Sequence, residues 1–253
     1  MFLKWIQKSR FLHAIFNSFL FGNSTSKKGK NSVILKKSEG ICLNTKIKML
    51  GNGNSIEFSE FYHLKNTTIV IKGNGNRIVI GPNVKIIDGL IWILGDENSL
   101  EFAGEDTLNR TEIALQYDNN SIDFERHVIS GGFMQIGKIK NETDLVKIYA
   151  AEGTKIQIKE RASLAEGVKI RSSDSHPIFQ NDSRINHAKD IVIGSHTWIG
   201  ANASLFKGAK IGDNSIVGAA SFVSKDFSTY ENVMLVGNPA NIIKENVRWD
   251  YSF

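Results

Sequence analysis

The sequence predicts an all-β protein built as a parallel β-helix, a solenoid of short strands joined by tight corners. The first observation is a six-residue repeat, in which a branched apolar residue occupies every sixth position: Ile193, Ile199, Leu205, Ile211, Val217 and Val223. A small residue follows four positions after each of the first five: Thr197, Ala203, Ala209, Ser215 and Ser221. The second observation is a longer repeat of 22 residues upstream. A period of six fits neither a helix nor a single strand, but it fits one short strand plus one corner.

The 22-residue repeat has four copies, and each places a Gly/Asn-rich corner before an alternating strand. The copies begin at Gly51, Gly73, Gly95 and Tyr117. Alternation predicts that each strand turns inward first at Ile56, Ile78, Leu100 and Ile122, and again two residues later. Equivalent positions carry Asn54, Asn76, Asn98 and Asn120. Asn tolerates a left-handed backbone, and stacked amides can pair along the axis, so residues 39–130 are expected to form about four coils.

Composition restricts the class of protein and its partners. With 253 residues, 41% hydrophobic and 23% charged, the chain resembles an ordinary globular protein, and no apolar run is long enough to span a bilayer. Cys42 is the only cysteine, which excludes an intrachain disulfide and a cysteine-rich zinc site and favours a cytoplasmic setting. The net charge of +5 favours anionic partners such as phosphorylated cofactors, acidic glycans or a membrane face. Nucleic acid is not expected, because no basic run is interleaved with aromatic residues.

The patterns divide the chain into four segments. Residues 1–38 are expected to hold an amphipathic N-terminal helix and a basic linker, and residues 39–150 the coils of about 22 residues. Residues 151–236 form the hexapeptide-repeat β-helix with a loop at 171–190, and residues 237–253 form a short C-terminal tail. Two placements of the helix stay open. It packs on the body or on a sister subunit, or it lies peripherally on the inner membrane with nearby lysines at acidic head groups.

The loop at 171–190 is the candidate functional site, because the scaffold does not need it. Asp174 and His176 are two residues apart, so in an extended segment both side chains project to the same side. A carboxylate there could orient one ring nitrogen and leave the other as a base; the alternative is two solvated loop residues. Trp198 is expected to face outward at a corner, either as a subunit contact or as a wall of a substrate or pantetheine groove.

Several segments of the chain resemble the hexapeptide-repeat, or left-handed β-helix, acyltransferases. They are residues 190–200 (Asp-Ile-Val-Ile-Gly-Ser-His-Thr-Trp-Ile-Gly), Lys207-Gly208, Gly218-Ala-Ala-Ser221, Lys225-Asp226 and Gly237-Asn-Pro-Ala240. The resemblance covers about residues 155–245. Within the family, Ser-Ser-Asp-Ser-His followed by Arg184-Ile-Asn186 is most similar to O-acetyltransferases that act on capsular or lipopolysaccharide sugars. The left-handed winding is an implication of the resemblance, since the spacing itself does not set a hand.

The resemblance also implies a donor, an assembly and roles for particular residues. The donor is acetyl-CoA, the acceptor a sugar or polysaccharide, and the enzyme a homotrimer with active sites shared between subunits; no metal is implied. His176 matches the catalytic histidine, with Asp174 beside it, and Arg171 and Asn186 are expected to contact the acceptor. Residues expected to bind the cofactor are Trp198, Ala201, Ala219, Ser224, Lys225 and Lys244. Asn241 replaces a basic residue of the family's terminal motif.

These expectations lead to one main function and three alternatives. The main one is acetyl-CoA-dependent O-acetylation of a bacterial surface polysaccharide, capsule or O-antigen, by direct transfer with His176 as general base. The second keeps the donor but acetylates the amine of a sugar nucleotide or small amino sugar. The third is a zinc hydratase that would use His176, His187 and His196. The fourth is a structural solenoid without enzymatic activity.

Overall fold

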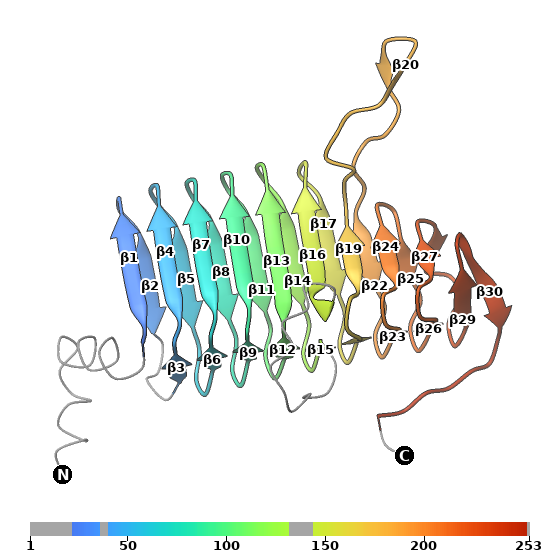
Figure 1. Ribbon diagram of the computed structural model, residues 1–253, viewed down its shortest axis with the longest axis horizontal. Helices are drawn as coiled ribbons and strands as arrows, with labels where there is room; N and C mark the ends of the chain where they lie inside the picture. Colours follow the sequence, from blue (N-terminus) through green and yellow to red (C-terminus); the bar gives the residue numbers. More distant parts are fainter. Residues whose placement is uncertain (1–21, 36–39, 132–143, 252–253) are drawn as a thin grey trace.

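The chain winds through successive coils of three short strands, so that the same three strand directions repeat along one axis (Figure 1). This computed structural model describes residues 22–35, 40–131 and 144–251. Strands one coil apart pair in parallel, and this pairing produces three sheets, here named A, B and C. The predicted all-β parallel β-helix is confirmed.

Each sheet takes one strand from every coil of the described chain. Sheet A contains β1 (Ser24–Lys28), β4 (Lys46–Leu50), β7 (Thr68–Lys72), β10 (Leu90–Leu94), β13 (Thr111–Gln116), β16 (Val146–Ala151), β19 (Lys169–Arg171), β24 (Ser204–Phe206) and β27 (Phe222–Val223). Sheet B contains β2 (Ser32–Leu35), β5 (Ser55–Phe58), β8 (Arg77–Ile80), β11 (Ser99–Phe102), β14 (Ser121–Phe124), β17 (Lys155–Ile158), β22 (Ile191–Ile193), β25 (Lys210–Ile211) and β28 (Asp226–Phe227). Sheet C contains β3 (Ile41–Leu43), β6 (His63–Lys65), β9 (Lys85–Ile87), β12 (Thr107–Asn109), β15 (Ile129–Ser130), β18 (Ser163–Leu164), β23 (Trp198–Ile199), β26 (Ile216–Val217), β29 (Met234–Gly237) and β30 (Ala240–Lys244).

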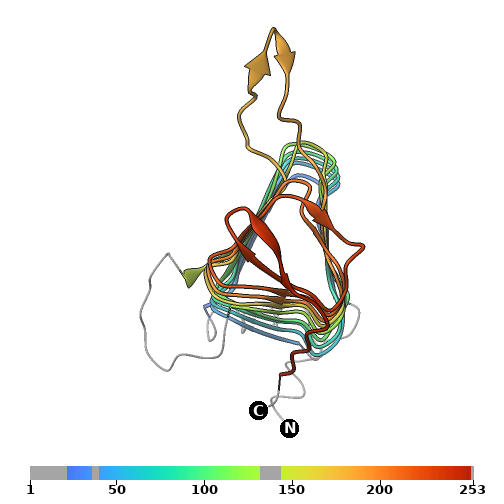
Figure 2. The ribbon, with the colours of Figure 1, turned by 90° about the vertical axis from the view of Figure 1, so that its right-hand side faces the viewer.

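Viewed from its carboxyl end, the β-helix has a triangular section with one sheet on each side (Figure 2). We name the corners by the sheets that they join: AB, BC and CA. The chain runs along sheet A to the AB corner, returns along sheet B, and crosses back along sheet C while it advances toward the viewer. The coils therefore wind in the left-handed sense that the family resemblance implies, against the usual right-handed crossover.

The coil length changes along the axis. Lys46 pairs with Thr68, 22 residues later, in the amino-terminal half. Ser204 pairs with Phe222, only 18 residues later, near the carboxyl end. The shorter coils are the three-hexad turns that the six-residue repeat predicts, and their strands shrink to two or three residues. The prism therefore keeps its three faces while its perimeter contracts after the 171–190 loop.

The interior is a single column of apolar side chains. All six apolar hexad residues are at most 1% exposed, and so are the five small residues that follow them. In the longer coils, the predicted inward pairs from Ile56/Phe58 to Ile122/Phe124 are at most 2% exposed. Phe102 and Phe124 stack with ring centroids 4.8 Å apart. Full burial of such side chains contributes about 1.5–3 kcal/mol each, so the continuous column is the main source of stability.

The predicted asparagine ladder is confirmed at the AB corner. The side-chain amide of each ladder residue donates to the Oδ1 of the preceding one, at 2.9–3.0 Å from Asn76, Asn98 and Asn120. These residues are at most 1% exposed. The expected left-handed backbone is wrong for them, since the positive φ angles fall instead on the neighbouring corner residues. The ladder asparagines satisfy buried polar groups at the corner, and the neighbouring residues with positive φ form the turn.

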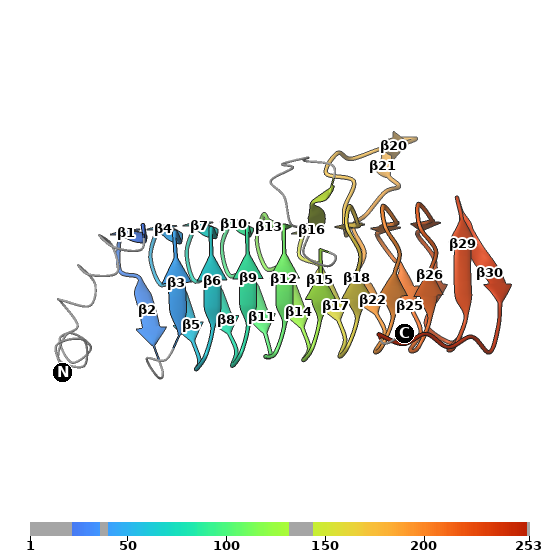
Figure 3. The ribbon, with the colours of Figure 1, turned by 60° about the horizontal axis from the view of Figure 1, so that its bottom comes forward.

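The two ends of the described chain differ from the predicted segments. The strands β1 and β2 lie within residues 1–38, so the solenoid begins before the predicted boundary at 39. The predicted N-terminal helix lies in residues 1–21, outside the described residues. The predicted C-terminal tail contributes β30, which pairs antiparallel with β29, and then runs back along the coils (Figure 3). In the part of the chain that is described, no helix is long and apolar enough to cross a membrane.

Candidate active site

The loop predicted at 171–190 leaves the AB corner between β19 and β22 and projects away from the prism (Figures 1 and 2). Its tip is an antiparallel hairpin of β20 (Phe179–Gln180) and β21 (Ser183–Arg184). The scaffold strands on both sides continue in register with the next coil, so the loop interrupts no ladder. Its exposed apolar side chains are Ile178, Phe179 and Ile185, at 52%, 61% and 56%. A loop of this kind is positioned for recognition rather than for packing within its own chain.

A carboxylate of the preceding coil anchors the loop at two points. Glu152 follows β16, and its Oε1 accepts a hydrogen bond from the Ser173 hydroxyl. Its Oε2 accepts from Arg184 Nη2 at 2.5 Å, which ties the far arm of the loop to the same corner. The hydrogen bond from Ser173 is the largest cause that holds the pKa of Glu152 below its ordinary value, and Arg184 adds to it. Glu152 is therefore an ionised clamp across the base of the loop.

Asn186 fixes the backbone on both sides of His176. Its Oδ1 accepts the N–H of Ile178 at 2.6 Å, and its Nδ2 donates to the His176 carbonyl at 2.8 Å. The same Nδ2 donates to Asp174 at 2.9 Å. Asn186 is only 7% exposed and its amide has three partners inside the loop, whereas its contact with the acceptor stays a prediction. It positions the segment that carries His176.

Asp174 has different partners from the predicted one. Its carboxylate accepts hydrogen bonds from Asn186 and from Lys207, which lies at the AB corner of the following coil. Burial alone would raise the pKa of Asp174, but these hydrogen bonds and the charges of Lys207 and Arg171 outweigh it and lower the pKa. Among the described residues no hydrogen bond joins Asp174 to the exposed His176 ring. Asp174 therefore holds the side chains of Asn186 and Lys207 and does not set the imidazole tautomer.

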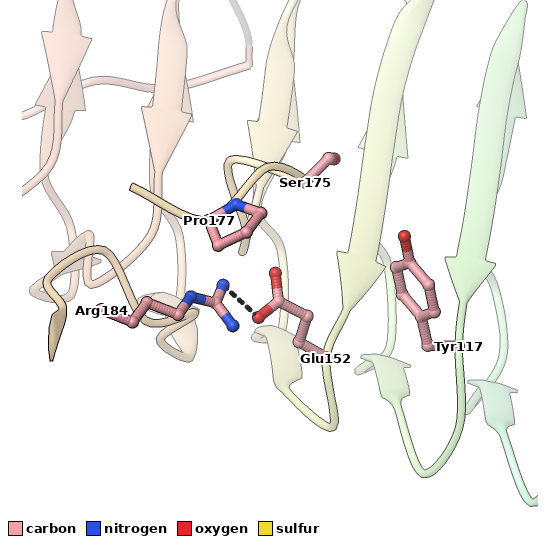
Figure 4. Close-up of a pocket in the computed structure, with 5 residues that line it drawn as sticks. All are labelled: Tyr117, Glu152, Ser175, Pro177 and Arg184. Atoms are coloured by element: carbon pink, nitrogen blue, oxygen red, sulfur yellow. Dashed lines mark hydrogen bonds and ion pairs between the residues drawn. The ribbon is translucent and has the colours of Figure 1, made fainter. Parts of the chain in front are cut away.

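A pocket of about 280 Å³ opens beside this loop, on the side of the preceding coils (Figure 4). It is lined by Tyr117, Glu152, Ser175, Pro177 and Arg184, and we call it the corner pocket. Two of these residues, Ser175 and Pro177, are the immediate neighbours of His176 in the sequence. Arg171 Nη2 donates to Ser175 Oγ at 2.9 Å, and Arg171 Cζ lies 5.7 Å from the centroid of the Tyr149 ring. The predicted acceptor residue Arg171 thus supports the pocket wall.

Trp198 lies on sheet C, next to the BC corner, and is 43% exposed, so its predicted outward orientation is confirmed. The returning C-terminal tail places Trp249 beside it, with ring centroids 6.1 Å apart. Trp249 stacks on His196 at 4.4 Å and donates from Nε1 to the His196 carbonyl at 2.8 Å. Tyr251 completes the anchor by donating to the Arg161 carbonyl at 2.7 Å. The tail therefore builds an aromatic wall around Trp198.

Comparison with known proteins assigns this arrangement to a family. Residues 190–225 match the bacterial transferase hexapeptide family (six repeats). A polysialic acid O-acetyltransferase of Neisseria meningitidis is 33% identical over 201 residues, which are 79% of this chain and 86% of that protein. The chain belongs to the hexapeptide-repeat O-acetyltransferases. Its enzymatic class is thereby confirmed, and the alternative of a purely structural solenoid is wrong.

Two solved structures extend the comparison to three dimensions. The polysialic acid O-acetyltransferase OatWY superposes with a TM-score of 0.66 at 28% identity, covering 82% of this chain and 92% of that one. The polySia-specific acetyltransferase NeuO gives a TM-score of 0.65 at 24% identity, covering 91% and 89%. The second likeness is one of fold alone. Both matches extend beyond the hexads, so they include long coils as well as the hexapeptide segment.

The residues expected to bind the cofactor of this O-acetyltransferase lie at two different corners and on sheet C. Ala201 and Ala219 are at the CA corner in successive coils, where Ala220 N donates to Ala201 O at 2.8 Å. Ser224 and Lys225 are exposed at the AB corner, one coil after Lys207. On sheet C lie Trp198 and, at the end of β30, Lys244. A single chain therefore brings together the loop residues, but it does not bring Trp198 or Ala201 to His176.

The three histidines of the zinc alternative are not gathered into one place. His176 and His187 belong to the AB loop, whereas His196 is stacked under Trp249 near the BC corner. Within residues 22–35, 40–131 and 144–251, no group of three metal-ligating side chains is close enough to hold an ion.

Several residues of the site were missed by reasoning from the sequence. Glu152, Lys207 and Trp249 each act across at least 30 residues of sequence, on Arg184, Asp174 and His196 respectively. No local pattern marks Glu152 or Trp249, and the Lys207-Gly208 motif does not indicate that Lys207 binds Asp174. One signal was present in the repeat: Tyr117 begins the fourth copy at the position where the other copies have glycine.

Proposed function

We propose that this protein transfers an acetyl group from acetyl-CoA to a hydroxyl of an acidic capsule polysaccharide, with His176 as general base. The observation that carries the proposal is the match to the Neisseria polysialic acid O-acetyltransferase along 86% of that protein's length. The net charge of +5 agrees with a polyanionic acceptor. We place the reaction in the cytoplasm, the setting that a single cysteine favours.

The proposed chemistry is direct transfer. The sugar hydroxyl gives its proton to a ring nitrogen of neutral His176 while its oxygen attacks the thioester carbonyl. The new C–O bond forms as the C–S bond breaks, and the CoA thiolate leaves. Asn186 supports this step because its bonds to the His176 carbonyl and to Ile178 N hold the backbone that carries the imidazole. A positioned base of this kind contributes roughly 10²–10⁴-fold to turnover.

The developing oxyanion needs a preorganised donor, and we assign that role to the Ala201 N–H. Ala201 lies at a tight corner after Gly200, and among the described residues its N–H takes part in no hydrogen bond. A backbone donor aimed at the position of the oxyanion is worth about 10²–10³-fold in rate. Trp198, exposed on the adjacent sheet, would pack against the acetyl group or the pantetheine arm.

This assignment requires a second subunit, and we propose a homotrimer with shared sites. The supporting observation is geometric: His176 belongs to the loop at the AB corner, whereas Trp198 is in β23 of sheet C, the side opposite that corner, and Ala201 is at the CA corner. Figure 2 shows this loop leaving one corner of the triangle. The exposed apolar tip of the hairpin gives the loop a surface with which to reach a neighbouring subunit. Ser224, Lys225 and Lys244 would then line the CoA arm, with both lysines exposed for its phosphates.

The test is acetyl transfer from radiolabelled acetyl-CoA to polysialic acid, other capsule polysaccharides and free amino sugars. We expect label in an acidic polysaccharide and a fall in kcat of roughly 10²–10⁴-fold in His176→Ala. The matched control is His187→Ala, an exposed histidine of the same loop, which should keep kcat. Label confined to free amino sugars, or equal activity in the two histidine variants, would contradict the proposal.

A further inference from the structure

One column of equivalent residues at the AB corner changes from glycine to larger residues at the corner pocket. In the first three copies of the long repeat, the AB corner turns at Gly51, Gly73 and Gly95, with φ between 111° and 139°. The fourth copy has Tyr117 at this position, with φ 69°. Gln116 pairs with Ala151, so the next member of the column is Glu152. Both non-glycine members line the corner pocket.

Sterics explain the glycines and leave the tyrosine unexplained as a packing residue. A Cβ on any of the three glycines would come within 1.9–2.1 Å of the carbonyl oxygen of the next corner. The Tyr117 backbone does what the glycines do: its N–H bonds Leu94 O at 2.8 Å, and its carbonyl accepts the ladder amide of Asn98 at 2.9 Å. Its ring, however, is 57% exposed and stands beside the pocket (Figure 4). These backbone bonds do not need the side chain, and a left-handed tyrosine costs conformational energy.

The pocket offers the groups that a sugar ring requires. Tyr117 presents an aromatic face, and Pro177 an apolar edge on the other side (Figure 4). Glu152 offers acceptor oxygens and Ser175 a hydroxyl, while Arg184 adds donor N–H groups beyond the one that Glu152 uses. A volume of about 280 Å³ is at the small end of ligand pockets, which suits one pyranose rather than a cofactor of the size of CoA.

The pocket also has a fixed relation to the proposed base, because Ser175 and Pro177 flank His176. Glu152 accepts from the Ser173 hydroxyl and Ser173 Oγ accepts from Ser175 N at 2.9 Å, so the pocket wall and the backbone next to His176 are attached to the same preceding coil. A ring bound there would place the next residue of a glycan chain beside His176.

We propose that the corner pocket is an acceptor subsite that binds the pyranose next to the one being acetylated, with Tyr117 as its stacking platform. The proposal rests on the proposed function and adds a prediction of its own: the enzyme prefers an oligosaccharide to the corresponding monosaccharide. Tyr117 is a specificity residue in this scheme, since it touches the acceptor but not the reacting atoms.

The test compares Tyr117→Gly and Tyr117→Phe with the wild type, using polysialic acid oligomers and free sialic acid as acceptors at saturating acetyl-CoA. Tyr117→Gly should raise KM for the oligomer about tenfold and abolish the preference over the monosaccharide, as loss of one aromatic contact implies. Its kcat and its KM for acetyl-CoA should stay unchanged, and its thermal midpoint should not fall, because glycine is the residue of the three preceding coils and adopts this backbone without strain. Tyr117→Phe should behave as the wild type.

Glu97→Gly is the matched control. It replaces another left-handed residue at the same corner by the glycine that Gly53 and Gly75 provide in earlier coils, but it does not line the pocket. An unchanged oligomer KM in Tyr117→Gly, or equal changes in both glycine variants, would overturn the subsite. If His176→Ala abolishes transfer while Tyr117→Gly does not alter KM, the subsite alone fails. If the wild type labels neither acceptor, the proposed function and the subsite fail together.

Discussion

The asparagine ladder provides the sharpest prediction for stability, through the substitution Asn76→Ala. Asn76 is fully buried at the centre of the ladder. Its Oδ1 accepts from the backbone N–H of Asn98 at 2.9 Å and from its amide at 3.0 Å. Its Nδ2 donates to Asn54 Oδ1 at 2.9 Å and to the Gly95 carbonyl at 2.8 Å. Alanine removes all four contacts and restores none of them.

The magnitude depends on which groups remain unsatisfied. The Asn98 N–H is buried and loses its partner, at a cost of about 1–3 kcal/mol. The Gly95 carbonyl is partly buried and can be reached by water, so its loss adds less. The amides of Asn54 and Asn98 keep other partners. We therefore expect Asn76→Ala to lower the free energy of unfolding by about 2–4 kcal/mol, a large part of the usual total of about 5–15 kcal/mol.

Asn74→Ala is the internal control, because the Asn74 side chain belongs to a parallel, exposed ladder two residues away: its Nδ2 donates to Asp96 Oδ1 at 3.2 Å, and its Oδ1 accepts from Asn52 N at 3.0 Å. Water can replace its partners, so we expect a loss below about 1 kcal/mol. The assay is urea unfolding followed by circular dichroism at one protein concentration, with equal m-values required for the comparison. Equal midpoints for the two variants would refute the argument that burial, and not the ladder pattern itself, makes these bonds stabilising.

Three further predictions test the pH response, the loop and the tail. Burial raises the pKa of Asp106 to about 8 in the folded chain. The free energy of unfolding should therefore fall as pH rises from about 4 to about 8, by an amount on the order of 2–5 kcal/mol. In a pH series of urea titrations, Asp106→Asn should lose this slope. Asn186→Ala frees the backbone around His176 and should lower kcat about 10–100-fold with little effect on KM for acetyl-CoA; an unchanged kcat in steady-state assays would contradict its positioning role. Trp249→Ala removes the aromatic ring beside Trp198 and should raise KM for acetyl-CoA several-fold in the same assays. A change in the acceptor KM alone would contradict the assignment of Trp198 to the donor site.

The repeat made most of the fold predictable. Each hexad contains its own inward-facing residue and its own corner. The burial of Ile193, Leu205 and their equivalents could therefore be predicted without any knowledge of distant contacts. The same holds for Asn76 and the ladder, because identical residues at a fixed interval must stack in register. A solenoid is nearly one-dimensional, and its sequence therefore carries its structure locally.

The site was less predictable, because its bonds join different coils. The spacing of Asp174 and His176 predicts that the two side chains pair. Local spacing cannot predict Lys207, which donates a hydrogen bond to the Asp174 carboxylate from the following coil. The role of Asn186 depended on where the loop folds back, which no periodic pattern encodes. The solenoid starts earlier than the sequence predicts. The exposed lysines and serines of β1 and β2 are typical of a linker, and only the parallel pairing with β4 and β5 shows that these residues form strands.

The scaffold is part of the site and not merely its support. Glu152 grips the loop from the coil before it, and Lys207 grips it from the coil after it. Both residues are at AB corners, where a change of side chain leaves the sheets intact, so the solenoid can acquire such anchors without loss of its ladder. A loop of the same sequence without Glu152 and Lys207 would keep the internal bonds of Asn186, but it would lose its attachment to the neighbouring coils. The position of the loop that carries His176 is therefore set by contacts from the coil before it and the coil after it, as well as by bonds within the loop.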